Sequence, residues 1–195
     1  MHQLVLASGS SYRRALLAKL DLPFDYASPD IDESPRSNES AADLVTRLSE
    51  AKARALAARF PQALIIGSDQ VAVLDDQFLG KPGDGERAFA QLQAASGKTV
   101  VFLTGLCVLN AATGEARTVV EPFTVRFRSL SDSQIRQYLA REEPYDCAGS
   151  FKAEGLGIAL FESLSGDDPN ALIGLPLIRL VDLLKQEGVE VLGQA

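Results

Sequence analysis

Histidine is almost absent from this chain of 195 residues, in which His2 is the only one. Catalytic triads built on histidine and zinc sites with histidine ligands each need that side chain at the site. A single histidine beside the start of the chain excludes both classes. Any metal would then be held by oxygen ligands, which favours Mg²⁺ or Mn²⁺.

Cysteine and long apolar segments are scarce as well. Cys107 and Cys147 are the only cysteines, and without a secretory signal they predict reduced thiols in a cytoplasmic protein. We expect Cys147 to be buried rather than reactive. No apolar run approaches the roughly 18 residues that span a bilayer. The formal net charge of −7 argues against general binding to nucleic acid or to an anionic membrane, but it leaves room for a local basic pocket.

What is present is ordinary for a globular protein, with 46% hydrophobic and 23% charged residues. A chain of this length can bury a substantial core, in one compact body or in two small lobes. It contains no internal repeat, no low-complexity segment and no clear linker. We therefore expect a single domain over residues 1–195.

The stretch A-L-I-I-G-S-D-Q-V-A-V-L, residues 63–74, is the centre around which the chain is organised. Its first four residues predict a short strand that is buried on both faces. Gly67 would let the backbone turn or approach a ligand closely, and a second strand follows Asp69. A carboxylate at the end of a buried strand needs a metal, a cation or a hydrogen-bond network. The alternative for Asp69 is a turn aspartate that closes a loop.

An anion site is expected near the N-terminus. A first strand over residues 3–7 leads into S-G-S-S-Y-R-R and then into a helix with apolar periodicity. Ser8 or Ser10 is the natural N-cap, which places Arg13 and Arg14 in the first turn. Backbone N–H groups, hydroxyls and guanidinium groups would together bind phosphate there, although the sequence has no P-loop motif. The alternative is a capped helix with solvated arginines.

Two more charged residues stand out further along the chain. The acidic loop of residues 28–40 contains Glu33, which would help to hold a metal or would be solvated like most loop acids. Ser40 caps a helix that we expect to run to about Phe60. Lys52 falls within the apolar stripe of that helix, so it either snorkels to solvent or meets an anionic partner.

The second half of the chain is expected to alternate β-rich runs with helices. Asp75 and Asp76 predict a hairpin turn, and Ser131 with Gln134 predicts a capping box. The other expected elements are a helix over residues 84–95, β-rich runs over 99–109 and 117–127, a strand over 158–161 and a final helix with Pro176 in its first turn.

Two loops in that half contain further charged candidates. Lys81 stands between Gly80 and Pro82, where a fixed turn would present it to a phosphate; the alternative is an ordinary loop lysine. Glu154 precedes a glycine in the segment C-A-G-S-F-K-A-E-G-L-G. Glu154 is either a further site residue or an exposed loop acid.

Six motifs, in order and correctly spaced, resemble those of the Maf-like nucleotide pyrophosphatases over essentially the whole chain. They are L-A-S-G-S-S-Y-R-R-A-L-L near the N-terminus, E-A-K-A around Lys52, I-I-G-S-D-Q-V around Asp69, L-G-K-P at Lys81, Y-D-C-A-G-S-F-K-A-E-G at residues 145–155 and N-A-L-I-G-L-P-L near the C-terminus. No single motif is decisive, but the ordered set is highly specific.

The resemblance implies an α/β fold, with a curved mixed β-sheet flanked by helices and two lobes around a deep cleft, often in a homodimer. It also implies metal-dependent hydrolysis of nucleoside triphosphates to the monophosphate and pyrophosphate. Asp69 matches the family's proton acceptor, and we expect it to hold the metal together with Glu33. The positions that match the family's phosphate- and metal-handling residues are Ser8, Arg13, Glu33, Lys52 and Lys81, with Arg14 as a neighbour.

Tyr12, Gln70 and Glu154 occupy the three positions that separate the branches of this family. The branch that resembles dTTP and UTP pyrophosphatases has Arg, Thr and Gln there. This chain is similar to the 7-methyl-GTP branch, although that branch commonly has Pro and Trp where Ser11 and Tyr12 stand here. The methylated base is cationic, so an aromatic ring stacked on it contributes about 0.5–2 kcal/mol. Glu154 would accept hydrogen bonds from the guanine N1–H and amino groups.

The expected reaction is attack of water on the α-phosphorus of 7-methyl-GTP, with Asp69 taking the proton and pyrophosphate leaving. The expected ligands are a small nucleotide and Mg²⁺ or Mn²⁺, with neither nucleic acid nor membrane as a partner. One alternative is a housecleaning pyrophosphatase for another modified or canonical nucleotide, such as dTTP or UTP. The other is a nucleotide-binding regulator of cell division that has no catalytic activity.

Overall fold

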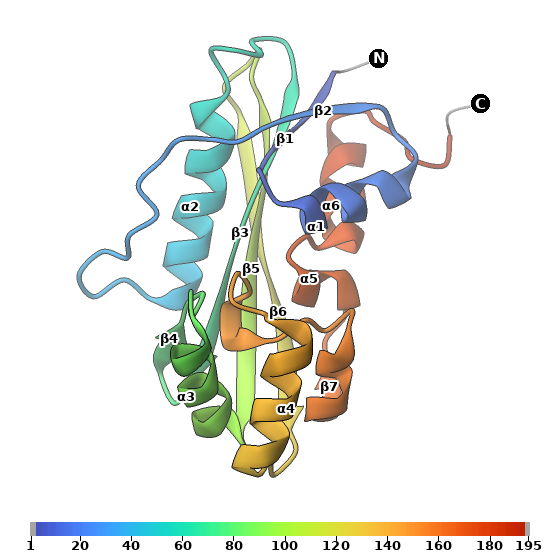
Figure 1. Cartoon of the computed structure of the whole chain (residues 1–195). Helices are drawn as coiled ribbons and strands as arrows, with labels where there is room; N and C mark the ends of the chain where they lie inside the picture. Colours follow the sequence, from blue (N-terminus) through green and yellow to red (C-terminus); the bar gives the residue numbers. More distant parts are fainter. Residues whose placement is uncertain (1–2, 194–195) are drawn as a thin grey trace. The chain divides into compact units, whose positions relative to one another are not determined.

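The computed structural model describes residues 3–193, which form a mixed α/β structure (Figure 1). The chain divides into two compact units. Of the described residues, unit 1 comprises 3–69, 104–121 and 174–193, and unit 2 comprises 70–103 and 122–173. Three long strands contribute residues to both units: β3 (Leu64–Leu74), β5 (Thr99–Asn110) and β6 (Ala116–Phe127).

Each of the other main elements belongs to one unit. Unit 1 contains β1 (Leu4–Ala7), α1 (Ser11–Leu17), β2 (Phe24–Ala27), α2 (Ala41–Ala55) and α6 (Leu177–Gln186). Unit 2 contains β4 (Gln77–Leu79), α3 (Gly85–Ala95), α4 (Asp132–Glu142), β7 (Phe161–Ser165) and α5 (Pro169–Ile173). Short 3₁₀ turns are η1 (Ala18–Leu20), η2 (Ala148–Ser150) and η3 (Leu156–Leu160). Within residues 3–193, no helix is both long enough and apolar enough to cross a membrane.

In the described part of the chain, the strands form a seven-stranded sheet in the order β2-β1-β3-β5-β6-β7, with β4 paired to β3. Strand β1 runs parallel to β2 and to β3, whereas the β3–β4 and β6–β7 pairs are antiparallel. The parallel pair β1–β2 is joined through α1, and the antiparallel pair β3–β4 is joined by a tight hairpin. The expected α/β class, a mixed sheet with flanking helices, is therefore confirmed.

In unit 1, helix α2 packs directly against the backbone of the sheet. A Cβ atom at Gly67 of β3 would overlap the carbonyl oxygen of Ser49, and one at Gly105 of β5 would overlap that of Val45. Glycine at both positions allows the helix to approach this closely. Figure 1 shows α2 (cyan) on one side of β1 and β3, and helices α1 and α6 on the other.

Strand β3 runs without interruption from Leu64 to Leu74, so the first of the two roles considered for Gly67, a turn, is wrong. Asp69 accordingly lies within the strand rather than at its end. The glycine is needed for the close contact with α2 and not for a change of chain direction. A sequence contains the same glycine in both cases, which is why the pattern was misleading.

Two further boundaries differ from the expected ones. Helix α2 ends at Ala55 rather than near Phe60, because the next two N–H groups, of Leu56 and Ala57, bond three residues back instead of four. The strand expected over residues 158–161 begins only at Phe161, after the 3₁₀ turn η3. Strand β2 and helix α5 were not predicted, since both are too short to show a periodic pattern.

The predicted helix starts and the hairpin turn are confirmed. The side chains of Ser10 and Ser40 each accept a backbone N–H bond in the first turn of their helices, and Ser131 forms the complete capping box. Asp75 and Asp76 have φ angles of 48° and 63°, as a tight hairpin between β3 and β4 requires.

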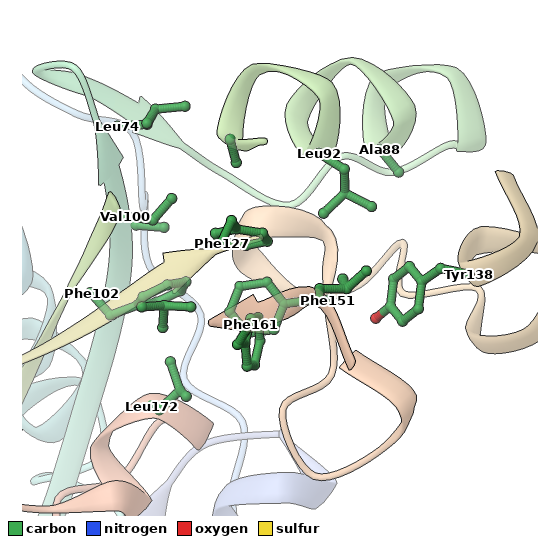
Figure 2. Packing of buried hydrophobic residues seen from close by; sticks show 14 of the residues in the cluster. Leu74, Ala88, Leu92, Val100, Phe102, Phe127, Tyr138, Phe151, Phe161 and Leu172 are labelled. Atoms are coloured by element: carbon green, nitrogen blue, oxygen red, sulfur yellow. The ribbon is translucent and has the colours of Figure 1, made fainter. Parts of the chain in front are cut away.

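The core of unit 2 is a cluster of aromatic and aliphatic side chains from its strands and from helices α3 and α4 (Figure 2). The ring centre of Phe151 lies 5.3 Å from that of Phe102 and 5.6 Å from that of Phe127, both edge-on. It lies 4.8 Å from the ring centre of Phe161, in the same relative orientation. Since Phe151 is three residues from Glu154, this core anchors the loop that carries Glu154.

Candidate active site

Lys52, Glu33 and Asp69 form an ion-pair cluster in unit 1. The Nζ atom of Lys52 lies 2.6 Å from Oδ1 of Asp69 and 3.0 Å from Oε1 of Glu33. Lys52 is 5% exposed and Asp69 is 8% exposed, whereas the side chain of Glu33 is 57% exposed. Lys52 therefore meets anionic partners instead of snorkelling, and Asp69 is not a turn residue.

The residue repeats of helix α2 and strand β3 explain why Lys52 contacts Asp69. Lys52 continues the buried stripe of α2 that includes Val45 and Leu48. Successive side chains of a strand point to opposite faces, so Asp69 shares with Gly67 the face that packs on α2. The missing side chain at Gly67 brings the helix close enough for the lysine to reach the carboxylate.

Arg13 adds a second cation to the cluster. Burial lowers the pKa of its guanidinium group, while the charges of Asp69 and Glu33 oppose that shift. The arginine is therefore close enough to both carboxylates to interact with them electrostatically. Two cations, Arg13 and Lys52, face two carboxylates, and their formal charges balance.

The backbone carbonyl of Gly174 orients Arg13. The arginine Nε donates to this oxygen at 2.8 Å. Ser68 Oγ lies 3.0 Å from the same oxygen and 2.8 Å from the carbonyl oxygen of Gly105. Gly174 has a φ of 122°, which other residues rarely adopt. Sequence reasoning missed Ser68 and Gly174 as site residues, although the first directly precedes Asp69 and the second lies in the motif N-A-L-I-G-L-P.

Ser8, Tyr12 and Arg14 lie at the junction of β1 and α1. Ser8 is 5% exposed, and its Oγ accepts the backbone N–H of Ser10 at 3.1 Å. Tyr12 is partly buried in the first turn of α1. The Cζ of Arg14 lies 4.3 Å from the ring centre of Tyr26 on β2, a cation–π contact. The two consecutive arginines of α1 thus have different surroundings, and only the first belongs to the ion-pair cluster.

The other three predicted site residues lie in unit 2. Gln70 donates from Nε2 to the carbonyl oxygens of Ala171 at 2.7 Å and Leu172 at 3.2 Å, both in α5. Lys81 is exposed in the loop after β4, and Glu154 is exposed in a turn between η2 and η3. Gln70 is therefore engaged with backbone in this structure, while both charged side chains are open to solvent.

The loop that carries Glu154 is fastened to α4. Lys152 donates from Nζ to the backbone carbonyl of Glu142 at 2.8 Å, and its backbone N–H donates to the Tyr138 hydroxyl at 3.0 Å. Burial raises the pKa of Tyr138 well above its ordinary value, so the hydroxyl keeps its proton. A Cβ atom at Gly157 would overlap the carbonyl of Lys152, so the loop folds tightly back on itself.

Glu33 and Asp69 are the carboxylates available for a metal near Arg13 and Lys52. Among residues 3–193, no three Asp, Glu, His or Cys side chains gather as a metal site. Mg²⁺ is commonly bound through one or two carboxylates together with substrate phosphates and water. The pair therefore fits a divalent metal that shares its ligands with a phosphate, rather than one held by protein alone.

Cys147 is a poor nucleophile in this structure. Burial, followed by the charge of Asp146, raises the pKa of its thiol to about 12. The thiol therefore stays protonated at neutral pH. Cys147 is half-buried, whereas Cys107 is buried, and both are free thiols.

A model of the Maf-like protein family matches residues 3–187. The chain belongs to the Maf family. A 7-methyl-GTP pyrophosphatase from Nitrosococcus oceani is 63% identical to this Maf chain over 189 residues, which cover 97% of the chain and 95% of the relative. One from Pseudomonas aeruginosa is 62% identical over 191 residues, covering 98% and 100%. The family resemblance indicated by the six motifs is therefore confirmed.

Among solved structures, the Staphylococcus aureus Ham1 protein resembles this Maf chain with a TM-score of 0.45 and 13% identity. The match covers 65% of this chain and 72% of that one. A likeness of this degree is too weak to support an argument.

Proposed function

We propose that this Maf-family chain is a pyrophosphatase that hydrolyses 7-methyl-GTP to 7-methyl-GMP and diphosphate. The observation that carries the proposal is the contact of 2.6 Å between Lys52 and the nearly buried Asp69, with Glu33 and Arg13 beside it. Relatives that are 62% and 63% identical over almost the whole chain bear the name 7-methyl-GTP pyrophosphatase.

Asp69 is the proton acceptor of the proposed reaction. Water attacks the α-phosphorus, the bond from that phosphorus to the bridging oxygen breaks, and diphosphate leaves. Asp69 takes the proton from the attacking water, and its position in the middle of a strand fixes its carboxylate. The contact with Lys52 orients the carboxylate before a nucleotide binds.

Lys52 and Arg13 bind the phosphate groups and neutralise charge that develops on them. A divalent cation, Mg²⁺ or Mn²⁺, held by Glu33 and Asp69, would supply further positive charge at the phosphate oxygens. Ser8, Lys81 and Arg14 are the other phosphate-binding residues of the proposal, and Lys81 is well exposed for this role.

Tyr12 and Glu154 select the base in this proposal. The aromatic ring of Tyr12 stacks on the cationic 7-methylguanine, and the carboxylate of Glu154 accepts hydrogen bonds from the guanine edge. Gln70 acts differently, because its amide nitrogen is engaged with α5 carbonyl groups. We assign Gln70 the role of holding α5 in place.

We infer one Maf-like domain over residues 1–195, composed of the two units, and a homodimer in solution. Multi-angle light scattering on the purified chain tests the assembly, since a monomer mass at micromolar concentration would contradict the homodimer.

The test of function is pyrophosphate release with Mg²⁺ or Mn²⁺ from 7-methyl-GTP, GTP, dTTP, UTP and CTP. The Asp69→Asn variant is the control for contaminating activity. Preference for 7-methyl-GTP that disappears in the control supports both the reaction and the base selectivity. Preference for dTTP or UTP would overturn the selectivity and keep the enzyme.

The regulator alternative is decided in the same assay series. Tight nucleotide binding without turnover of any substrate would favour a non-catalytic regulator. Calorimetric titration with a non-hydrolysable triphosphate analogue measures that binding separately from turnover.

A further inference from the structure

The loop of residues 28–40 has no helix or strand of its own, yet it delivers Glu33 to the ammonium of Lys52. The regular backbone hydrogen bonds of a helix or strand therefore do not fix the position of Glu33, whose side chain is 57% exposed. Loops of this kind are ordinarily mobile unless side chains tie them down.

Arg47 supplies contacts that hold this loop. Its Nε donates to Oε1 of Glu39 at 2.6 Å, and its Nη2 donates to Oε2 of the same carboxylate at 2.8 Å. The same Nη2 donates to the backbone carbonyl of Ser34 at 3.1 Å. We call Arg47, Glu39 and the Ser34 carbonyl the loop clamp. Paired bonds between a guanidinium and a carboxylate fix both distance and orientation.

The loop clamp is well sheltered and internally supported. The side chain of Arg47 is 20% exposed and that of Glu39 is 8% exposed. Glu39 also accepts the backbone N–H of Arg36 at 2.9 Å, and Asp32 accepts that of Ser34 at 2.9 Å. These bonds close the loop on both sides of the Ser34 carbonyl.

The location of the loop clamp links it to the ion-pair cluster. Ser34 directly follows Glu33, so the bond to its carbonyl fixes the backbone beside the carboxylate. Arg47 and Lys52 lie on the same helix, α2, which is itself packed on the sheet. One rigid element therefore holds both the loop that carries Glu33 and the lysine that Glu33 contacts.

We propose that Arg47 is a positioning residue for the reaction, which holds Glu33 beside the Lys52 ammonium through its bonds to Glu39 and to the Ser34 carbonyl. The hydrogen bonds of Arg47 go to Glu39 and Ser34, while Asp69 acts on it only through its charge. Its kinetic consequence rests on the proposed function. Its structural consequence, an ordered loop, does not.

A double-mutant cycle tests the kinetic consequence. Arg47→Met should lower kcat/KM for 7-methyl-GTP by about 10- to 100-fold, the range found for groups that orient the direct ligands of a site. Because Arg47 acts through Glu33, the same substitution in a Glu33→Gln background should cause no further loss. Equal losses in the two backgrounds, or no loss in the first, would overturn the proposal.

Arg54→Met is the matched control. Arg54 lies on the same helix and donates from Nε to Glu50 at 2.7 Å, but it has no contact with the loop of residues 28–40. Its activity should stay within about twofold of the wild-type value, as expected for an exposed helical ion pair. Glu39→Gln breaks the loop clamp from the other side and should also lower kcat/KM. It replaces Arg47→Met in the test if Arg47→Met folds poorly.

Hydrogen exchange of the backbone amides separates this proposal from the proposed function. In Arg47→Met, the amides of Ser34, Arg36 and Glu39, which donate hydrogen bonds within the loop, should exchange at least about tenfold faster, while those of β3 should not change. Fast exchange in a chain that hydrolyses no nucleotide would refute the function and keep the loop clamp as the device that orders the loop. Unchanged exchange would refute the loop clamp whatever the activity.

Discussion

Lys52 on α2 and Asp69 on β3 face each other at 2.6 Å, where the backbone of a helix touches the backbone of the sheet. Removal of the lysine leaves a nearly buried carboxylate without its hydrogen-bond partner. We expect Lys52→Met to lower the free energy of unfolding by about 1–3 kcal/mol. The matched control is Lys98→Met, because Lys98 forms a pair of the same length, 2.6 Å, with Asp75 in a far more exposed setting. Its cost should be below about 1 kcal/mol, and equal costs in urea unfolding would contradict this reading of the buried pair.

Asp69→Asn keeps the size of the side chain and removes its ability to accept a proton as a base. We expect kcat for 7-methyl-GTP to fall by roughly 10²–10⁴, the range for loss of a general base. Asp76→Asn is the control, since Asp76 is exposed in the hairpin turn and asparagine tolerates its positive φ. Turnover near the wild-type value in Asp69→Asn would remove Asp69 from the role of base.

Gly67→Ala tests the contact between α2 and β3 without changing any charge. The new methyl group would overlap the Ser49 carbonyl, so the helix would have to shift. We expect a loss of about 1–3 kcal/mol in the free energy of unfolding, together with lower activity as Lys52 moves. Gly80→Ala, where no atom lies within 4 Å of the new Cβ, should be neutral. A neutral Gly67→Ala would mean that α2 can move away freely.

Glu39 gives the loop clamp a defined pH dependence. Hydrogen bonds from Arg47, and then from the Arg36 N–H, lower the pKa of Glu39 from 4.5 to about 2. A pKa that is lower in the folded state contributes stability above pH 4.5, and that contribution is lost as the pH falls towards 2. The difference in melting temperature between wild type and Glu39→Gln should therefore be constant near neutral pH and shrink between pH 4.5 and 2. A difference that grows on acidification would have the wrong sign.

Tyr12 offers a test of base recognition. Tyr12→Phe keeps the aromatic ring, whereas Tyr12→Leu keeps only apolar volume. If stacking on the cationic base contributes about 0.5–2 kcal/mol, Tyr12→Leu should lower the preference for 7-methyl-GTP over GTP by about 2- to 30-fold. Tyr12→Phe should retain that preference in kcat/KM. Equal preferences in both variants would show that the ring does not sense the methyl group.

Local signals in the sequence predicted the fold well where the cause is itself local. The caps at Ser40 and Ser131 and the hairpin at residues 75–76 depend on a few neighbouring residues, and the structure confirms them. The helical period alone sets which side chains share a face, so it placed Lys52 in an apolar stripe and left two possibilities, snorkelling or an anionic partner. The structure shows the anionic partner.

Other features depend on contacts between distant segments and left no local pattern. The glycine at 67 is required by the carbonyl of Ser49, which is 18 positions away in the chain. The sequence therefore suggested a turn or a close approach to a ligand, and did not reveal the contact with the helix. Glu39 looks like any other acid in a polar loop, and only the structure pairs it with Arg47. The placement of Gly174 against Arg13 spans 161 positions and could not be inferred from spacing.

The two glycine contacts under α2 have a mechanical consequence. Val45 and Ser49 are one helical turn apart, and each presses a carbonyl group against a strand that has no side chain at that point. Because helix α2 is in contact at two successive turns, it can neither slide along strands β3 and β5 nor rotate about its own axis. Every group borne on α2 must then keep its spacing from the strands to within the play of its own side chain, so the geometry around Asp69 is set before any nucleotide arrives.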